Sequence, residues 1–343
     1  MGLYEEIHEQ PAVLRHWLDT QRDAVQRAAD AVRDRQIDYV FLAARGTSDH
    51  AGIYAQYLWG SRNRLPVALA APSLFTMYPG TPRLEHALVV GISQSGQSPD
   101  IVEVVTEGRR QGAATVVITN DPGSPLAQAA EHTIPLDAGP ERAVAATKTY
   151  TAELLAIAAF SAALAGDDPA VLAPVPDAVA GALTLDATAA GIAAGQRDLT
   201  HCVVLGRGYH YATAREWALK LKELAYVLAD AYSPADFQHG PIAIVDRGFP
   251  ILAVAPSGAV QADQIALLAR LRDDYGADLL VVSDDPAALA LGRARLPLPA
   301  DVPEWLQPIV SIVPAQLYTY HLTRAKGYDP DHPRTLSKVT RTQ

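Results

Sequence analysis

The sequence predicts an α/β protein in which two similar units follow one another, each a parallel sheet covered by helices on both faces. First, short continuous runs of apolar, often β-branched residues alternate with helical patterns. Strands that are buried on both faces read in this way. Second, the alternation occurs twice, once in each half of the 343 residues. The two halves therefore indicate a duplication.

The expected elements follow in the same order in both halves, because each apolar run ends at a Gly- or Ser-containing loop. In the first half they are a strand at 39–44, a helix near 51–59, a strand at 87–92, a helix from 101 and a strand at 112–121. In the second half they are a strand at 202–205, a helix through Leu228, a strand at 251–255 and a strand at 276–285. A linker is expected around 167–176, followed by a helix at 177–195. We therefore expect one domain at 1–170 and a second at 171–343.

Composition excludes several classes of protein. Nearly half of the residues are apolar, which provides a core and argues against disorder. The net charge of −10, without a long basic run, argues against nucleic acid as a partner. The single cysteine, Cys202, rules out a disulfide framework and reads as a buried, inert thiol. No signal peptide opens the chain and no apolar run is long enough for a bilayer, which predicts a cytoplasmic protein that is not in a membrane.

The segment 91–100 predicts a phosphate site. It places four hydrogen-bonding side chains between a strand and a helix N-terminus, where unpaired N–H groups favour an anion. These residues are Ser93, Gln94, Ser95 and Ser98. An ordinary capped turn accounts for one or two serines, so four hydrogen-bonding side chains favour phosphate. Thr47 and Ser48 follow the neighbouring strand, so both segments can converge on one ligand. The second half keeps only a Ser-Gly pair here, which predicts one phosphate site per chain.

A second constellation carries the acid–base chemistry. Lys220 and Glu223 are three residues apart and share one face of an apolar helix. A surface ion pair is the ordinary reading of such a pair, but the apolar neighbours suggest a buried helix. His239 stands beside Gly-Pro, ahead of a strand-like run at 242–245. A partly buried carboxylate is a competent base, and a histidine can move a proton to a ring oxygen.

The sequence shows no sign of a metal or a cofactor. The ten histidines form no HExxH motif, and Gly206-Arg207-Gly208 lacks the third glycine of a dinucleotide fingerprint. No nucleophile elbow supports a serine hydrolase.

Motifs along nearly the full length carry a family resemblance. They are Glu6–Pro11, Arg45–Ser48, Ser93–Gly96, Thr119–Ser124, Val144–Lys148, Leu205–Gly208, Ala218–Glu223, His239–Pro241 and Pro333–Lys338. In this order they resemble tandem sugar isomerase (SIS) domains, especially the isomerase half of the glucosamine-6-phosphate synthases. The resemblance implies two flavodoxin-like parallel sheets.

The resemblance also implies a role for each candidate residue. Thr47, Ser48, Ser93, Gln94, Ser95 and Ser98 would hold the 6-phosphate of a sugar. Glu223 would move a proton between C2 and C1, and Lys220 would assist at the enolate. His239, supplied by the partner subunit of a homodimer with shared active sites, would open the sugar ring. Lys338 would contact the open-chain carbonyl end, and Glu141 and Ala146 would contact the sugar.

The chain also departs from the synthases. It begins close to the SIS region, so we expect no glutaminase domain and no synthesis driven by glutamine. Ser98-Pro99-Asp100 is more like stand-alone deaminases and deglycases of the family. Arg142 and Ala146 replace smaller and hydroxyl-bearing family residues near the sugar, which leaves the substrate open.

The first functional hypothesis is an amino-sugar-6-phosphate isomerase/deaminase that converts glucosamine 6-phosphate to fructose 6-phosphate and ammonia. A second is a dehydratase of N-acetylglucosamine 6-phosphate, which loses the C3 hydroxyl after the same proton abstraction. A deglycase of sugar-amino-acid phosphates is a third. A sugar-phosphate sensor is the alternative outside enzymes, but no helix-turn-helix segment or basic patch supports it.

Overall fold

The computed structural model describes residues 2–338, which divide into two compact units. One unit contains strands β1 (Tyr39–Ala43) to β5 (His132–Pro135), and we call it the β1–β5 unit. It takes in residues 12–141, 148–173 and 337–338. The other contains strands β6 (His201–Gly206) to β10 (Ala294–Pro297), and we call it the β6–β10 unit. It takes in residues 2–11, 142–147 and 174–336. The domain boundary expected at 170 stays a prediction, and its outer limits, Met1 and 339–343, lie outside the described residues.

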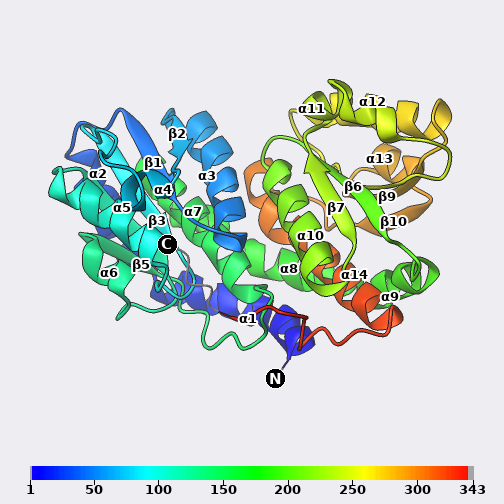
Figure 1. Ribbon diagram of the computed structural model, residues 1–343, viewed down its shortest axis with the longest axis horizontal. Coiled ribbons are helices and arrows are strands. Elements are labelled where there is room, and N and C mark those ends of the chain that lie inside the picture. Colours follow the sequence, from blue (N-terminus) through cyan, green and yellow to red (C-terminus); the bar gives the residue numbers. More distant parts are fainter. Residues whose placement is uncertain (1, 339–343) are drawn as a thin grey trace. The chain divides into compact units, whose positions relative to one another are not determined.

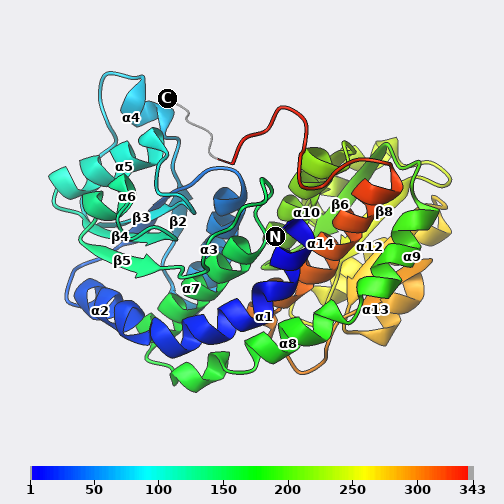
Figure 2. The ribbon, with the colours of Figure 1, turned by 90° about the horizontal axis from the view of Figure 1, so that it is seen from below.

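The β1–β5 unit is a five-stranded parallel sheet in the order β2-β1-β3-β4-β5 (Figure 1). Its other elements are α2 (Arg22–Arg33), α3 (Thr47–Asn63), β2 (Val67–Leu69), α4 (Ser73–Thr76), β3 (Ala87–Ile92), α5 (Pro99–Arg110), β4 (Ala114–Thr119), α6 (Pro125–Ala129) and α7 (Lys148–Ala165), with a 3₁₀ turn at Pro169–Leu172. Helix α1 (Leu3–Thr20) contributes residues from 12 onward. Helices α4, α5 and α6 pack on one face, and α2, α3 and α7 pack on the other (Figure 2).

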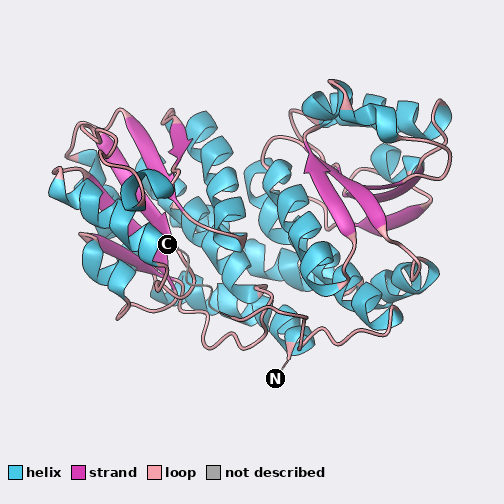
Figure 3. Ribbon diagram, viewed as in Figure 1, coloured by secondary structure: helices cyan, strands magenta, loops and turns pink. Residues whose placement is uncertain are grey.

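The β6–β10 unit repeats this plan with the order β10-β9-β8-β6-β7. Its other elements are α8 (Val175–Leu183), α9 (Asp186–Gly195), α10 (His210–Leu224), β7 (Leu228–Tyr232), α11 (Pro234–Gln238), β8 (Pro250–Val254), α12 (Gln261–Asp273), β9 (Asp278–Ser283), α13 (Pro286–Leu291) and α14 (Gln307–Ala325), with 3₁₀ turns at Pro241–Ile244 and Glu304–Leu306. Numbered within each unit, both sheets have the flavodoxin-like order 2-1-3-4-5. Figure 3 shows helices on both faces of each sheet. The predicted fold class is confirmed.

Each sheet is the core of its own unit. All six residues of β3 and all six of β4 are buried, as expected for strands between two helical layers. Val89 and Val117 pack against Val104 and Val105 of α5. Burying each such side chain is worth about 1.5–3 kcal/mol. The position of α5 on the sheet, and of the loop that precedes it, is therefore fixed by apolar packing.

Two local expectations beside the candidate catalytic residues were wrong. The helix predicted through Leu228 ends at Leu224, and Leu228 begins strand β7. The helix stops because Tyr226 adopts a left-handed backbone with φ 52°. The strand-like run at 242–245 belongs mostly to the 3₁₀ turn Pro241–Ile244, which begins at a proline and pairs with none of the strands described for residues 2–338.

The segment expected as one helix at 177–195 forms two, α8 and α9, which are separated at 184–185. Among the described residues, no single helix has the length and apolar character to cross a bilayer. The bent pair Pro169–Leu183 and Asp186–Gly195 meets that criterion jointly, by length and composition alone.

Cys202 lies in β6 and is buried, as the sequence predicts. Burial raises the pKa of the Cys202 thiol to about 12. The reactive thiolate is therefore scarce at neutral pH, which fits an inert structural cysteine.

Candidate functional site

The predicted phosphate residues lie where the strand order of the β1–β5 sheet reverses. Strand β1 pairs with β2 on one side and with β3 on the other, and Ala43 at its carboxyl end lies opposite Gly91. The segment 44–46 and the loop 93–98 therefore leave neighbouring strand ends. Each leads into a helix N-terminus, that of α3 or that of α5. Ligands of open parallel sheets bind in this crevice, and both helix dipoles favour an anion there.

The loop after β3 is shaped around Gly96. This residue has φ 62°, and a Cβ atom added to it would lie 2.1 Å from the Ser124 hydroxyl, so only glycine fits. Ser93 and Ser95 each accept a hydrogen bond from a backbone N–H within the loop. Within residues 2–338, the side chains of Gln94 and Ser98 make no hydrogen bond. Their polar atoms remain available to a ligand.

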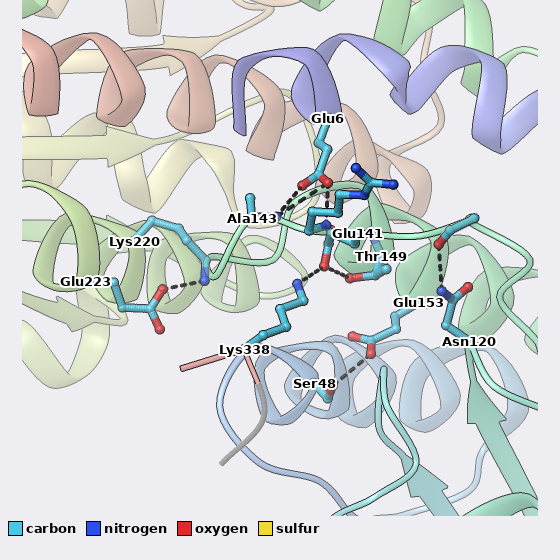
Figure 4. A network of polar contacts seen from close by, with 12 residues as sticks. Glu6, Ser48, Asn120, Glu141, Ala143, Thr149, Glu153, Lys220, Glu223 and Lys338 are labelled. Carbon is cyan, nitrogen blue, oxygen red and sulfur yellow. Dashed lines mark hydrogen bonds and ion pairs between the residues drawn. The ribbon is translucent and has the colours of Figure 1, made fainter. Parts of the chain in front are cut away.

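On the other side of this crevice, Ser48 is already engaged. Its hydroxyl donates to Glu153 Oε1 at 2.7 Å, and both residues are buried (Figure 4). In this arrangement the Ser48 hydroxyl proton is committed to a carboxylate. The N-terminal N–H groups of α3, which begins at Thr47, are what this segment presents to an anion.

Arg45 joins the two segments of the crevice. Its Nε donates to Asp100 Oδ2 at 2.8 Å, and the Asp100 side chain is completely buried whereas that of Arg45 is 49% exposed. Asp100 Oδ1 also accepts from the Ile101 N–H in the first turn of α5. The ion pair therefore ties the residue before Gly46 to the helix that follows the serine loop. Sequence reasoning missed this pair, because its members are 55 residues apart.

Lys338 and Glu141, two predicted substrate contacts, meet in the β1–β5 unit. The Lys338 Nζ lies 2.6 Å from Glu141 Oε2 (Figure 4). The buried Glu141 carboxylate also accepts hydrogen bonds from the backbone N–H and hydroxyl of Thr149, at the start of α7. The hydrogen bonds from Thr149 fix the Glu141 carboxylate, and this carboxylate in turn fixes the Lys338 ammonium.

Lys220 and Glu223 form a buried charge cluster in α10. The Lys220 Nζ lies 2.6 Å from Glu223 Oε2 and 3.3 Å from Glu216 Oε1. Glu216 is fully buried, whereas 23% of the Glu223 side chain is exposed. Glu223 is therefore the carboxylate of the cluster that a solute can reach. The alternative reading of a surface ion pair is wrong, because the lysine is 3% exposed.

The cluster keeps Lys220 positively charged. Burial lowers the pKa of the Lys220 ammonium, but the attraction of the two carboxylates and their hydrogen bonds outweigh it and raise the pKa above its usual value. Lys220 therefore cannot act as a base near neutral pH. Glu216 was missed from the sequence, although it stands four residues before Lys220 on the same helix face.

His239 lies at the end of α11 and is exposed. It lines a hollow of about 620 Å³ in the β6–β10 unit together with Arg207, Gln238 and Arg270. Lys220 and Glu223 do not line this hollow. The imidazole has no hydrogen-bond partner within residues 2–338. The structure of one chain therefore does not bring His239 together with the charge cluster of its own unit.

Ala146 is half-buried in the segment 142–147 of the β6–β10 unit. The buried Glu6 carboxylate fixes the start of this segment by accepting the backbone N–H groups of Arg142 and Ala143. The methyl side chain of Ala146 offers no hydrogen bond to a sugar. Within residues 2–338, no three His, Cys, Asp or Glu side chains are grouped so that they could hold a metal ion.

The corresponding loop of the β6–β10 sheet is closed by a side chain of the same unit. Glu304 accepts a hydrogen bond from the Ala259 N–H at 3.0 Å, and a Cβ atom on Gly258 would lie 2.4 Å from its carboxylate. Asp284 accepts the neighbouring Ser257 N–H at 2.7 Å. Carboxylates of the chain thus take up backbone donors that an anion would use. The single phosphate site per chain stays a prediction.

Comparisons with known proteins match both halves of the chain. The model of the SIS domain family matches residues 35–163 and 197–325. A glutamine–fructose-6-phosphate aminotransferase (isomerizing) from Gloeobacter violaceus is 35% identical over 98% of this chain, which spans 58% of that relative's length. The C-terminal domain of glucosamine-fructose-6-phosphate aminotransferase from Francisella tularensis matches with a TM-score of 0.87 and 29% identity, over 96% of this chain and 98% of that one. A Silicibacter pomeroyi chain, proposed to be a phosphosugar isomerase, matches with a TM-score of 0.85 and 35% identity. The match covers 96% of this chain and 100% of that one.

Proposed function

Because the chain belongs to the SIS domain family, we propose that it is an amino-sugar-6-phosphate isomerase/deaminase. Its substrate is glucosamine 6-phosphate, and its products are fructose 6-phosphate and ammonia. The observation that carries this proposal is the cluster in α10. A carboxylate that reaches solvent, Glu223, is held by a buried lysine that stays protonated. A base next to a fixed positive charge suits proton abstraction beside a carbonyl.

The reaction begins with the open-chain sugar. Glu223 removes the proton from C2, and the electron pair moves toward the C1 oxygen to form an enolamine. The Lys220 ammonium stabilises the negative charge that develops. Return of this proton to C1, with transfer of one amine proton to the C1 oxygen, leaves an imine at C2 and a hydroxymethyl group at C1. Addition of one water to the imine then releases ammonia and leaves the ketone of fructose 6-phosphate.

The other residues bind the substrate. Ser93, Gln94, Ser95 and Ser98, with the loop N–H groups and the N-terminus of α3 at Thr47 and Ser48, hold the phosphate; the Ser93 and Ser95 hydroxyls, which each accept a loop N–H, donate their own protons to it. Lys338 is poised on Glu141 to contact the carbonyl end of the open chain. No cofactor is needed, and the cytoplasmic location stays a prediction.

The product assay that tests this proposal compares two substrates. Purified chain is incubated with glucosamine 6-phosphate or with N-acetylglucosamine 6-phosphate, and fructose 6-phosphate and ammonia are measured. We expect both products from the free amine only, because an acetylated nitrogen blocks imine formation. An unsaturated product from the acetylated sugar alone contradicts deamination and indicates the dehydratase. Binding of both sugars without any product indicates a sensor.

We further propose that the enzyme is a homodimer in which His239 of the partner subunit opens the sugar ring. The support is that His239 is exposed and has no hydrogen-bond partner among the described residues 2–338. The 3₁₀ turn that follows it also exposes an isoleucine, Ile244, at 54%. An exposed apolar residue beside a candidate catalytic group is typical of a surface that another chain covers.

The substitution Ile244→Asp tests this surface. A charge in the middle of an apolar interface costs several kcal/mol of association free energy, so we expect the variant to sediment as a monomer and to lose most of its activity. Leu228→Asp is the matched control, because Leu228 is also exposed, at 75%, in the same unit. A dimeric, fully active Ile244→Asp variant would place the interface elsewhere.

A further inference from the structure

The predicted phosphate site contains one cation that no role yet explains. The segments 44–48 and 93–100, which follow β1 and β3, hold a single basic residue, Arg45. We propose that Arg45 is a direct ligand of the substrate phosphate and that the buried carboxylate of Asp100 aims it at this ligand. The inference rests on the proposed function, because it places the phosphate of the substrate at these two segments.

The hydrogen bonds of Arg45 leave most of its donors unused. A guanidinium has five N–H groups. Within residues 2–338, the only acceptor for the Arg45 side chain is Asp100, which takes the Nε proton at 2.8 Å. The two terminal nitrogens therefore have four N–H groups without a partner among these residues. With the side chain 49% exposed, they are accessible to a solute.

A structural arginine of helix α5, the helix that carries Asp100, makes a different set of hydrogen bonds. Arg110, in the last turn of α5, pairs with Glu107 through two parallel bonds, Nε to Oε2 at 2.6 Å and Nη2 to Oε1 at 2.7 Å. This two-bond geometry is the usual one for an arginine whose partner is a carboxylate. Arg45 makes only one such bond, although Asp100 has a second oxygen. That oxygen accepts the Ile101 N–H instead. The pair thus fixes the guanidinium by one edge and leaves the other edge open.

The position of this open edge suits a phosphate. Arg45 directly precedes Gly46 and the N-terminus of α3, and Asp100 lies in the first turn of α5, so the pair spans the crevice between the two helix N-termini. Hydroxyls and N–H groups alone would give a dianion only neutral donors in a chain of net charge −10. Charge-assisted bonds from arginine are about twice as strong as neutral ones, and the fork matches two phosphate oxygens.

The test measures phosphate affinity directly. Inorganic phosphate is titrated calorimetrically into the full chain, and kcat and KM are determined with glucosamine 6-phosphate. For Arg45→Gln we expect the affinity for phosphate to fall about ten- to a hundredfold, and KM to rise by the same factor, because a charge-assisted bond is lost. We expect kcat to stay within about twofold, because the phosphate is bound equally in the ground state and the transition state. Arg110→Gln should change none of these values.

A double variant separates ligand binding from structure. Arg45→Gln alone takes one counter-charge away from the buried Asp100 carboxylate, which can itself disturb the loop. Arg45→Gln with Asp100→Asn removes both charges, and we expect it to bind phosphate as weakly as the single variant. Recovery of wild-type affinity in the double variant would overturn the proposal, because Arg45 would then be a counter-ion only. Unchanged affinity in both variants, with phosphate still bound by the wild type, overturns this proposal and leaves the proposed function intact. A wild type that binds neither phosphate nor the sugar phosphate overturns both.

Discussion

Replacement of Glu223 by glutamine is expected to abolish turnover and leave substrate binding nearly intact. The amide has the shape of the carboxylate but cannot accept the C2 proton, so kcat should fall about 10²–10⁴-fold. The affinity for glucosamine 6-phosphate should change by less than about threefold, because the phosphate and the sugar hydroxyls carry the binding energy. Binding is measured calorimetrically on the inactive variant, and kcat by release of ammonia.

The fold should survive this change. Lys220 keeps Glu216 as a carboxylate partner at 3.3 Å, so no buried charge is left without a counter-ion. Glu223→Asp is the matched variant, since it retains the charge but withdraws it by one methylene. We expect Glu223→Asp to turn over slowly, with a measurable kcat that lies between those of the wild type and Glu223→Gln. Wild-type kcat in Glu223→Gln would remove Glu223 from the reaction.

Mixed dimers should regain activity that neither parent has. Glu223→Gln and His239→Asn are each expected to be inactive as homodimers. In a dimer with one chain of each kind, one active site carries both substitutions. The other combines an intact Glu223 with an intact His239 of the partner subunit. The mixed dimer should therefore show about half of the wild-type activity, as two-fold symmetry requires.

The experiment uses two affinity tags, one on each variant, to isolate the mixed dimer after co-expression. A mixture of the two homodimers, prepared at the same total concentration, serves as the control. If both residues of a site came from the same chain, every site of the mixed dimer would lack one of them. The mixed dimer would then be as inactive as its parents, and the shared active site would be wrong.

The sequence predicted the fold because both sheets repeat the same succession of apolar runs and polar loops. It also placed Ser48 and Ser95 after strands that are neighbours in the sheet; that these residues share a ligand stays a prediction. Local errors arose where one pattern fits two structures. The apolar residues Leu221, Leu224 and Leu228 recur at helical spacing, so the helix was expected to continue. The left-handed backbone at Tyr226 ends the helix, and no glycine or asparagine at this position indicates that turn in the sequence.

The site residues that sequence reasoning missed can be recognised only when the order of the strands, or the buried face of a helix, is known. Arg45 and Asp100 meet only because β1 and β3 are adjacent, although β2 and α4 lie between them in the chain. Glu216 stands at a spacing that is common on exposed helices, and only its burial distinguishes it. Glu304 could not be connected with Ala259 from the sequence, because a contact between distant loops follows no periodicity.

The most direct test of the account is whether the chain removes the C2 proton of glucosamine 6-phosphate. The sugar is incubated with the wild-type chain in D₂O, and the proton NMR spectrum is followed over time, with Glu223→Gln as the control. The account predicts that the C2 proton signal declines while fructose 6-phosphate appears, and that neither change occurs with Glu223→Gln. A C2 signal that persists with the wild-type chain, without any product, would contradict the proposed chemistry.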